Sequence, residues 1–104
     1  MNDELTGAQR RHLRGLAHHL DTTVQLGQRG LTPGVIAEAD RALDTHQLIK
    51  VRLVGSHQEK DQQVVALAAD LSATVISRVG HVVVLYRPDD DPDTPSLFAD
   101  EGRF

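Results

Sequence analysis

The segment Gly27-Gln28-Arg29-Gly30 combines residue types that can hold an anion. Glycine has no side chain to keep a ligand away from the backbone, and the Arg29 guanidinium can pair with phosphate. Thr32 and Pro33 follow with the spacing of a helix N-cap and first helical position, so the positive end of a helix dipole would face the same anion. A tight turn without a ligand produces the same short pattern, and both interpretations stand at this point.

Further cations precede and follow this segment. Arg10, Arg11 and Arg14 fall on one arc of a helical wheel at about 100° per residue, beside an apolar stripe. Lys50 and Arg52 alternate with apolar residues, which places both on the polar face of a strand. These five cations are candidates to extend a phosphate-binding surface. A solvated helix face and protection of a strand edge are the alternative explanations.

Other kinds of chemistry find little support in the residues. There is no cysteine, and no two of the six histidines have the i, i+4 spacing of metal ligands on a helix. A serine nucleophile elbow, a Walker-type loop and a dinucleotide-binding glycine fingerprint are all missing from the sequence. We therefore expect no catalytic residue, no metal site and no cofactor.

Composition predicts one aliphatic domain. The chain has 104 residues, of which 39% are hydrophobic and only 3% aromatic, namely Tyr86, Phe98 and Phe104. Stacking of bases on aromatic rings is therefore a poor candidate mechanism. The acidic N-terminus and the lack of a long apolar run lead us to expect a cytoplasmic protein without a membrane segment.

The charge is distributed unevenly along the chain. The formal net charge is −4, but residues 88–104 carry six carboxylates against Arg103, a net charge of −5, so the other residues together carry +1. Three prolines interrupt the same acidic run. A segment of this composition buries too little apolar surface to offset the conformational entropy lost on ordering. We therefore predict a domain over residues 1–88 and an acidic, disordered tail over residues 89–104.

The elements that must position the candidate residues can be predicted from periodicity and caps. Thr6 with Gln9, and Ser56 with Glu59, have the spacing of capping boxes. Helices are expected over residues 7–20, 33–46 and from 57 to 71 or 72, and strands over 22–26, 48–54, 74–79 and 82–87. The α-β-α-β-α-β-β order implies an α/β (α+β) fold with three helices on a four-stranded mixed sheet. The continuous apolar run of residues 82–85 suits a central strand.

Four segments together resemble a known family. They are Leu13–His18, Leu26–Thr32, Leu48–Val51 and Val84–Pro88, which are collinear with successive signatures of the YhbY/CRM RNA-binding domain over about residues 5–88. The resemblance implies a fold similar to the C-terminal domain of bacterial translation initiation factor three. It also implies that the loop matching Gly27–Gly30 contacts RNA backbone, as in KH domains. Stand-alone bacterial members associate with precursors of the large ribosomal subunit, whereas plant organellar relatives assist intron splicing.

Two departures from the family pattern affect these expectations. Family members often place lysine in or beside the glycine loop, and here Gln28 and Arg29 stand instead, which changes the reach and geometry of the charge. The acidic tail is also foreign to the family pattern. It could screen the basic face when RNA is absent, a hypothesis motivated by the opposite charges of the two regions.

The sequence thus predicts an RNA-binding protein that assists ribosome assembly. The expected partner is ribosomal RNA in large-subunit precursors, bound by a monomer without DNA specificity; about four phosphates would give a log–log salt slope of roughly −3. The predicted RNA-binding residues are Gly27, Gln28, Arg29, Gly30, Thr32, Arg10, Arg11, Arg14, Lys50 and Arg52. The alternative is a protein-interaction module that docks on a ribosomal protein or assembly factor. A hydrolase or nuclease would need a metal or base that the sequence does not offer.

Overall fold

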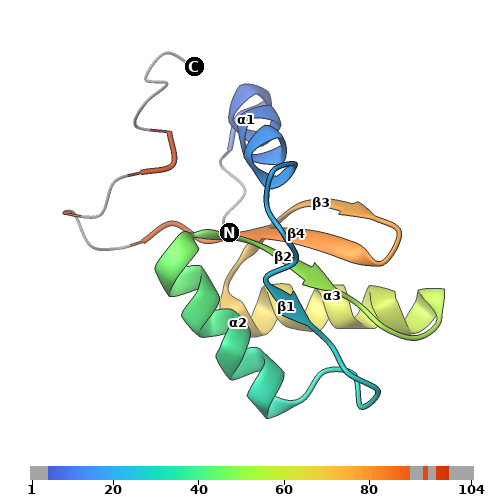
Figure 1. Cartoon of the computed structure of the whole chain (residues 1–104). Coiled ribbons are helices and arrows are strands. Elements are labelled where there is room, and N and C mark those ends of the chain that lie inside the picture. The colour runs from blue at the N-terminus through green and yellow to red at the C-terminus, as the bar shows by residue number, and fades with distance from the viewer. Residues whose placement is uncertain (1–4, 90–92, 94–95, 99–104) are drawn as a thin grey trace.

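The computed structural model describes residues 5–89, 93 and 96–98 (Figure 1). Its helices and strands follow one another in the order that the sequence predicts. They are α1 (Gly7–Ala17), β1 (Val24–Gln25), α2 (Pro33–His46), β2 (Leu48–Arg52), α3 (His57–Leu71), β3 (Thr74–Val79) and β4 (Val82–Tyr86). The predicted fold, three helices on a four-stranded mixed sheet, is therefore confirmed.

The four strands form one sheet in the order β1-β2-β4-β3. β1 runs parallel to β2, whereas β2 and β3 are both antiparallel to β4. β4 is thus an inner strand, as its continuous apolar run predicts. Because β1 and β2 are parallel, the segments that follow them, residues 26–32 and 53–56, leave the sheet at the same end.

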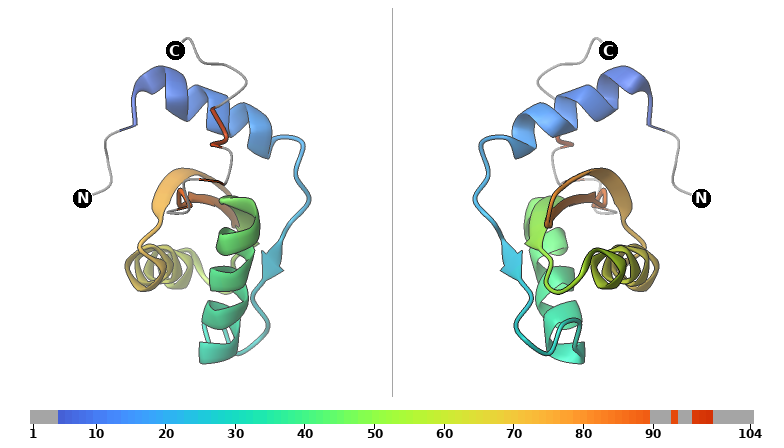
Figure 2. Two further views of the ribbon diagram at one scale, coloured as in Figure 1. Left: turned by 90° about the vertical axis from the view of Figure 1, so that its left-hand side faces the viewer. Right: turned by 90° about the vertical axis from the view of Figure 1, so that its right-hand side faces the viewer.

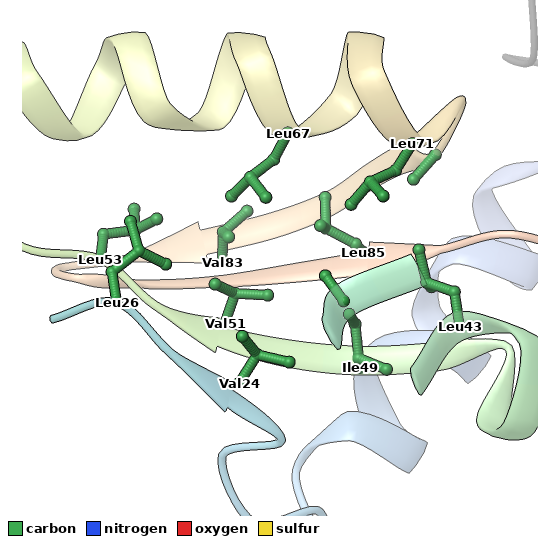
Figure 3. Close-up of a cluster of buried hydrophobic side chains, with 12 residues drawn as sticks. Val24, Leu26, Leu43, Ile49, Val51, Leu53, Leu67, Leu71, Val83 and Leu85 are labelled. Atoms are coloured by element: carbon green, nitrogen blue, oxygen red, sulfur yellow. The ribbon is translucent and has the colours of Figure 1, made fainter. Parts of the chain in front are cut away.

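The helices cover both faces of the sheet (Figures 1 and 2). α2 and α3 pack on one face, and α1 crosses the other. Figure 3 shows the aliphatic core on the α2/α3 face, where Val51, Leu67 and Leu85 are fully buried. A smaller cluster lies under α1 and is centred on Leu13 and Tyr86. The core is therefore largely aliphatic, as the composition predicts.

Some predicted boundaries are wrong. The first helix ends at Ala17 rather than at residue 20, because His19 and Leu20 donate backbone hydrogen bonds only three residues back, at 3.2 and 3.0 Å, and this tighter turn leads the chain out of the helix. β1 spans Val24–Gln25 rather than residues 22–26, although the backbone amides of Thr23 and Leu26 also donate to carbonyl oxygens of β2, at 2.9 and 3.0 Å. The strands predicted over 48–54 and 82–87 end at residues 52 and 86.

Arg87 fastens the end of β4 to the two helices on the larger core. Its guanidinium donates hydrogen bonds to Oδ1 of Asp40 and Oδ1 of Asp44, both at 2.8 Å, and to the Leu71 carbonyl oxygen at 3.0 Å. Only 20% of the Arg87 side chain is exposed. The C-terminal halves of α2 and α3 are therefore fixed to the sheet by one side chain.

Part of the predicted tail packs on the α1 side of the sheet. Leu97 and Phe98 contact the cluster under α1. The Phe98 ring centroid lies 6.0 Å from that of Tyr86, and Nε2 of His12 lies 3.1 Å from the Leu97 carbonyl oxygen. These apolar side chains therefore have a docking place on the domain. Phe104 and the acidic residues 90, 91, 100 and 101 lie outside the described residues.

Candidate nucleic-acid interface

Residues 27–30 form a tight turn between β1 and α2. The Gly30 backbone amide donates to the Gly27 carbonyl oxygen at 2.9 Å, and Gly30 adopts a φ of 71°, which glycine accepts without steric cost. Gln28 and Arg29 occupy the corners of the turn and are both exposed. Within the described residues the Arg29 side chain makes no hydrogen bond or ion pair, so its guanidinium is available to a ligand.

Thr32 sets the start of α2 directly after this turn. Its hydroxyl oxygen accepts a hydrogen bond from the Val35 backbone amide at 3.2 Å, and Pro33 occupies the first turn of the helix. Gly34 beside them is exposed. The positive end of the α2 dipole and the Arg29 side chain therefore lie at the same end of the sheet, an arrangement that favours an anion.

The sheet brings Arg52 to the same end. The Leu26 backbone amide donates to the Arg52 carbonyl oxygen at 3.0 Å, so the last residue of β2 lies beside the residue that precedes the turn. The Arg52 side chain is exposed and alternates with buried Val51, which places it on the α1 face of the sheet. Arg29 and Arg52 are thus the two predicted cations at the turn end.

Helix α1, which carries Arg10, Arg11 and Arg14, lies at the opposite end of the molecule from the turn (Figures 1 and 2). Arg11 and Arg14 are exposed there. Arg10 is half-buried, and its Nη1 donates to the Val75 carbonyl oxygen of β3 at 3.1 Å. The structure therefore does not bring the three arginines next to the turn, and it uses Arg10 to hold α1 on the sheet.

Lys50 also has a structural contact. Its Nζ donates to the Leu20 carbonyl oxygen at 2.9 Å, and its side chain is half-buried. Leu20 belongs to the connection between α1 and β1, so this hydrogen bond holds that connection against the sheet. Of the five predicted flanking cations, Arg11, Arg14 and Arg52 are left exposed, whereas Arg10 and Lys50 are engaged by the fold.

Gln63 of α3 is a residue that sequence reasoning missed. Its side-chain Nε2 donates to the Val54 carbonyl oxygen at 2.8 Å, and its Oε1 accepts from the Val54 amide at 3.1 Å. A Cβ placed on Gly30 would lie 3.6 Å from the same Nε2. Gln63 therefore positions the β2–α3 connection beside the turn. No sequence pattern indicates this role, because the two contacts cross between separate elements.

Two carboxylates near the start of α3 have lowered pKa values. The hydrogen bond from the Ser56 backbone amide, 2.7 Å long, is the main cause for Glu59, and a hydrogen bond from Arg78 is the main cause for Asp61. Both side chains are therefore ionised at neutral pH. Because Arg78 pairs with Asp61, its charge is largely neutralised within the chain.

Neither a metal centre nor a membrane-spanning helix is found in the described part of the chain. Its histidine, aspartate and glutamate side chains form no group of three or more that could hold a metal ion. Among the helices of residues 5–89, none combines the length and apolar character needed to cross a bilayer.

The fold and this end of the sheet define a small α+β domain that presents an exposed glycine turn, with arginines nearby, at the start of a helix. The CRS1/YhbY (CRM) domain model matches residues 5–87 of the chain. The chain therefore belongs to the CRS1/YhbY (CRM) domain family, which confirms the resemblance found in its four sequence segments.

Relatives of the chain carry names that refer to RNA. It is 43% identical over 88 residues to an RNA-binding protein of Haemophilus influenzae, covering 84% of this chain and 89% of the relative. It is 34% identical over 84 residues to the probable RNA-binding protein YqeI of Bacillus subtilis, covering 80% and 88%. The solution structure of a hypothetical protein from Staphylococcus aureus, described as a candidate RNA-binding protein, matches with a TM-score of 0.72 at 30% identity, covering 86% and 94%.

Proposed function

We propose that the chain binds RNA and that the Gly27–Gly30 turn contacts the RNA backbone. The observation that carries the proposal is the exposed Arg29, which has no partner among the described residues, at the corner of a turn that leads directly into the N-terminus of α2. Membership of the CRM family and the names of the relatives support RNA as the partner.

The physical basis is the binding of one or two phosphates at the turn end. Backbone amides near the helix start can donate to phosphate oxygens, and the Arg29 guanidinium adds charge-assisted hydrogen bonds. Arg52, beside the turn, offers a second cation. Contacts of this kind position RNA by its backbone and shape rather than by its sequence.

We propose further that the RNA is ribosomal RNA in precursors of the large subunit and that the chain assists assembly of that subunit. The support is the resemblance to stand-alone bacterial members of the family. The match covers 89% and 88% of the Haemophilus and Bacillus relatives, so the matching domain makes up most of each relative.

Charge reversal at the turn tests the RNA contact. Arg29→Glu places a negative charge beside the phosphate and should lower affinity for a labelled single-stranded RNA by at least about tenfold in fluorescence anisotropy. Arg41→Glu is the matched control, because Arg41 is exposed on α2 outside the turn. Equal affinity of the Arg29→Glu variant and wild type would contradict the contact and favour a module that docks on a ribosomal protein or assembly factor.

Sedimentation of cell extract tests the ribosomal role. Wild-type protein should co-migrate with large-subunit precursors on a sucrose gradient at low salt and dissociate at raised salt, because backbone contacts release counterions. The folded Arg29→Glu variant should stay at the top at both salts. Wild-type protein confined to the top fractions at low salt would remove the ribosome from the proposal, while the anisotropy result would still report on RNA binding itself.

A further inference from the structure

A hollow of about 400 Å³ lies between the Gly27–Gly30 turn and the first turns of α3. One wall comes from Gln28 and Arg29 of the turn, and the other from Glu59 and Gln62 of α3. Its size falls at the lower end of the range for small-molecule sites in proteins, roughly 300–1,000 Å³. The hollow therefore suits a ligand of a single ring system.

The polar side chains around the hollow divide into engaged and available groups. The Gln63 carboxamide uses both its nitrogen and its oxygen in hydrogen bonds to the Val54 backbone, so this side chain is held in place and lines the hollow. Gln28 and Gln62 are exposed, and their side chains make no hydrogen bond within the described residues. Each free carboxamide offers a donor and an acceptor, the combination that reads the edge of a nucleobase.

Glu59 gives the hollow a preference among possible ligands. Its Oε1 accepts the Ser56 backbone amide at 2.7 Å, and a Cβ on Gly55 would lie only 2.4 Å from that oxygen, so the absence of a side chain at Gly55 leaves room for the carboxylate. The hydrogen bond also lowers the pKa of Glu59 and keeps it ionised. A carboxylate repels phosphate but accepts hydrogen bonds from exocyclic amino groups.

The position of the hollow connects it to the phosphate contact, because Arg29 and Gly30 belong to both. An unpaired nucleotide whose phosphate lies on the turn has its base within reach of the hollow. No phenylalanine, tyrosine or histidine is among the described residues that line the hollow; Tyr86 is buried and Phe98 packs on it. Recognition of a base here would rest on its edge and on the flat guanidinium of Arg29.

We propose that this hollow, the base hollow, receives one unpaired nucleobase of the RNA whose backbone lies on the Gly27–Gly30 turn. Gln28 and Gln62 hydrogen-bond to its edge, and Glu59 favours bases that carry an exocyclic amino group over uracil. The inference rests on the proposed RNA binding at the turn and adds to it a site that distinguishes bases.

The test compares three short single strands of equal length: oligocytidine, oligouridine and an abasic ribose-phosphate strand. Wild type should bind oligocytidine about fivefold more tightly than oligouridine, the value of one net hydrogen bond to Glu59, and should bind oligouridine more tightly than the abasic strand. Gln62→Ala should reduce the advantage of both base-bearing strands over the abasic strand and keep its affinity for the abasic strand. Gln58→Ala is the control, because Gln58 is exposed on the same helix but does not line the hollow.

The possible outcomes distinguish between failure of the base hollow and failure of the RNA contact at the turn. Equal affinity of wild type for all three strands, or an unchanged preference in both Gln62→Ala and Gln28→Ala, would overturn the base hollow and leave the turn contact intact. If the Arg29→Glu variant bound the abasic strand as tightly as wild type does, the turn contact on which the inference rests would instead be refuted. Circular dichroism melting of each variant establishes that it is folded.

Discussion

Replacing Arg29 with glutamine should weaken the salt dependence of RNA binding by a defined amount. Glutamine removes the charge and keeps a polar side chain, so the change isolates the ionic contribution. Each phosphate neutralised on a single strand contributes about −0.7 to the slope of log affinity against log salt concentration. Arg29 and Arg52 are the two predicted cations at the turn end, so phosphate contact through these two side chains alone gives a slope of about −1.4, falling to about −0.7 in the variant.

An RNA long enough to reach both ends of the domain should give a steeper dependence of log affinity on log salt concentration. Arg11 and Arg14 are exposed on α1, and their side chains make no ion pair within the described residues. Their participation would bring the wild-type slope to about −2.8, close to the value expected for four phosphates. The double variant Arg11→Gln, Arg14→Gln should return the slope to about −1.4 only if one RNA spans both ends.

Fluorescence anisotropy with a labelled single strand, titrated at several potassium chloride concentrations between about 50 and 200 mM, measures these slopes. Wild type, Arg29→Gln and the α1 double variant are compared under identical conditions. A slope for folded Arg29→Gln equal to that of wild type would refute the phosphate contact at the turn. A wild-type slope near zero would refute backbone-led binding altogether.

Three further predictions concern the glycine turn, the Arg87 contacts and the cap of α3. Gly27→Ala should leave the free energy of unfolding unchanged, since a Cβ there meets nothing within 4 Å, and should weaken RNA binding. Gly30→Ala should lower the free energy of unfolding in urea by about 1–2 kcal/mol, because Gly30 has a positive φ. Arg87→Gln should cost about 1–2 kcal/mol in the same assay, since it removes charge-assisted hydrogen bonds to two carboxylates. Glu59→Gln keeps the cap but removes a titrating group. The pKa of Glu59 is lowered from 4.5 on folding, so wild type should lose stability as the pH falls below about 4.5 through the folded pKa, and the variant should lose less over that window in pH-dependent melting.

The order and type of the elements could be predicted because local signals agree with the final fold. Thr6 and Ser56 cap their helices through the predicted partners Gln9 and Glu59. The apolar run of β4 is buried between two helical layers, as its composition requires. The turn at Gly27–Gly30 could be predicted in the same way, because the spacing of the two glycines indicates a local backbone conformation and does not depend on distant contacts.

The layout of the cations could not be predicted, because it depends on contacts between residues far apart in the sequence. A helical wheel places Arg10 with Arg14, but only the packed structure shows that Arg10 reaches a carbonyl of β3. Lys50 likewise meets Leu20 only because α1 and its connection fold over the sheet. Sequence patterns indicate which face of a helix is apolar but not which face of the sheet the helix covers, so the sequence alone does not place the arginines of α1 relative to the turn.

The short β1 strand has a consequence for how the turn behaves over time. β1 contains only Val24 and Gln25 and pairs with one neighbour, whereas β4 is hydrogen-bonded along both of its edges. Local opening costs least where the fewest backbone hydrogen bonds must break, so the amide of Leu26 should exchange with solvent deuterium faster than those of β4. A segment that opens at low cost can adjust its backbone to the irregular path of a single strand, while the anchored sheet behind it keeps the domain folded.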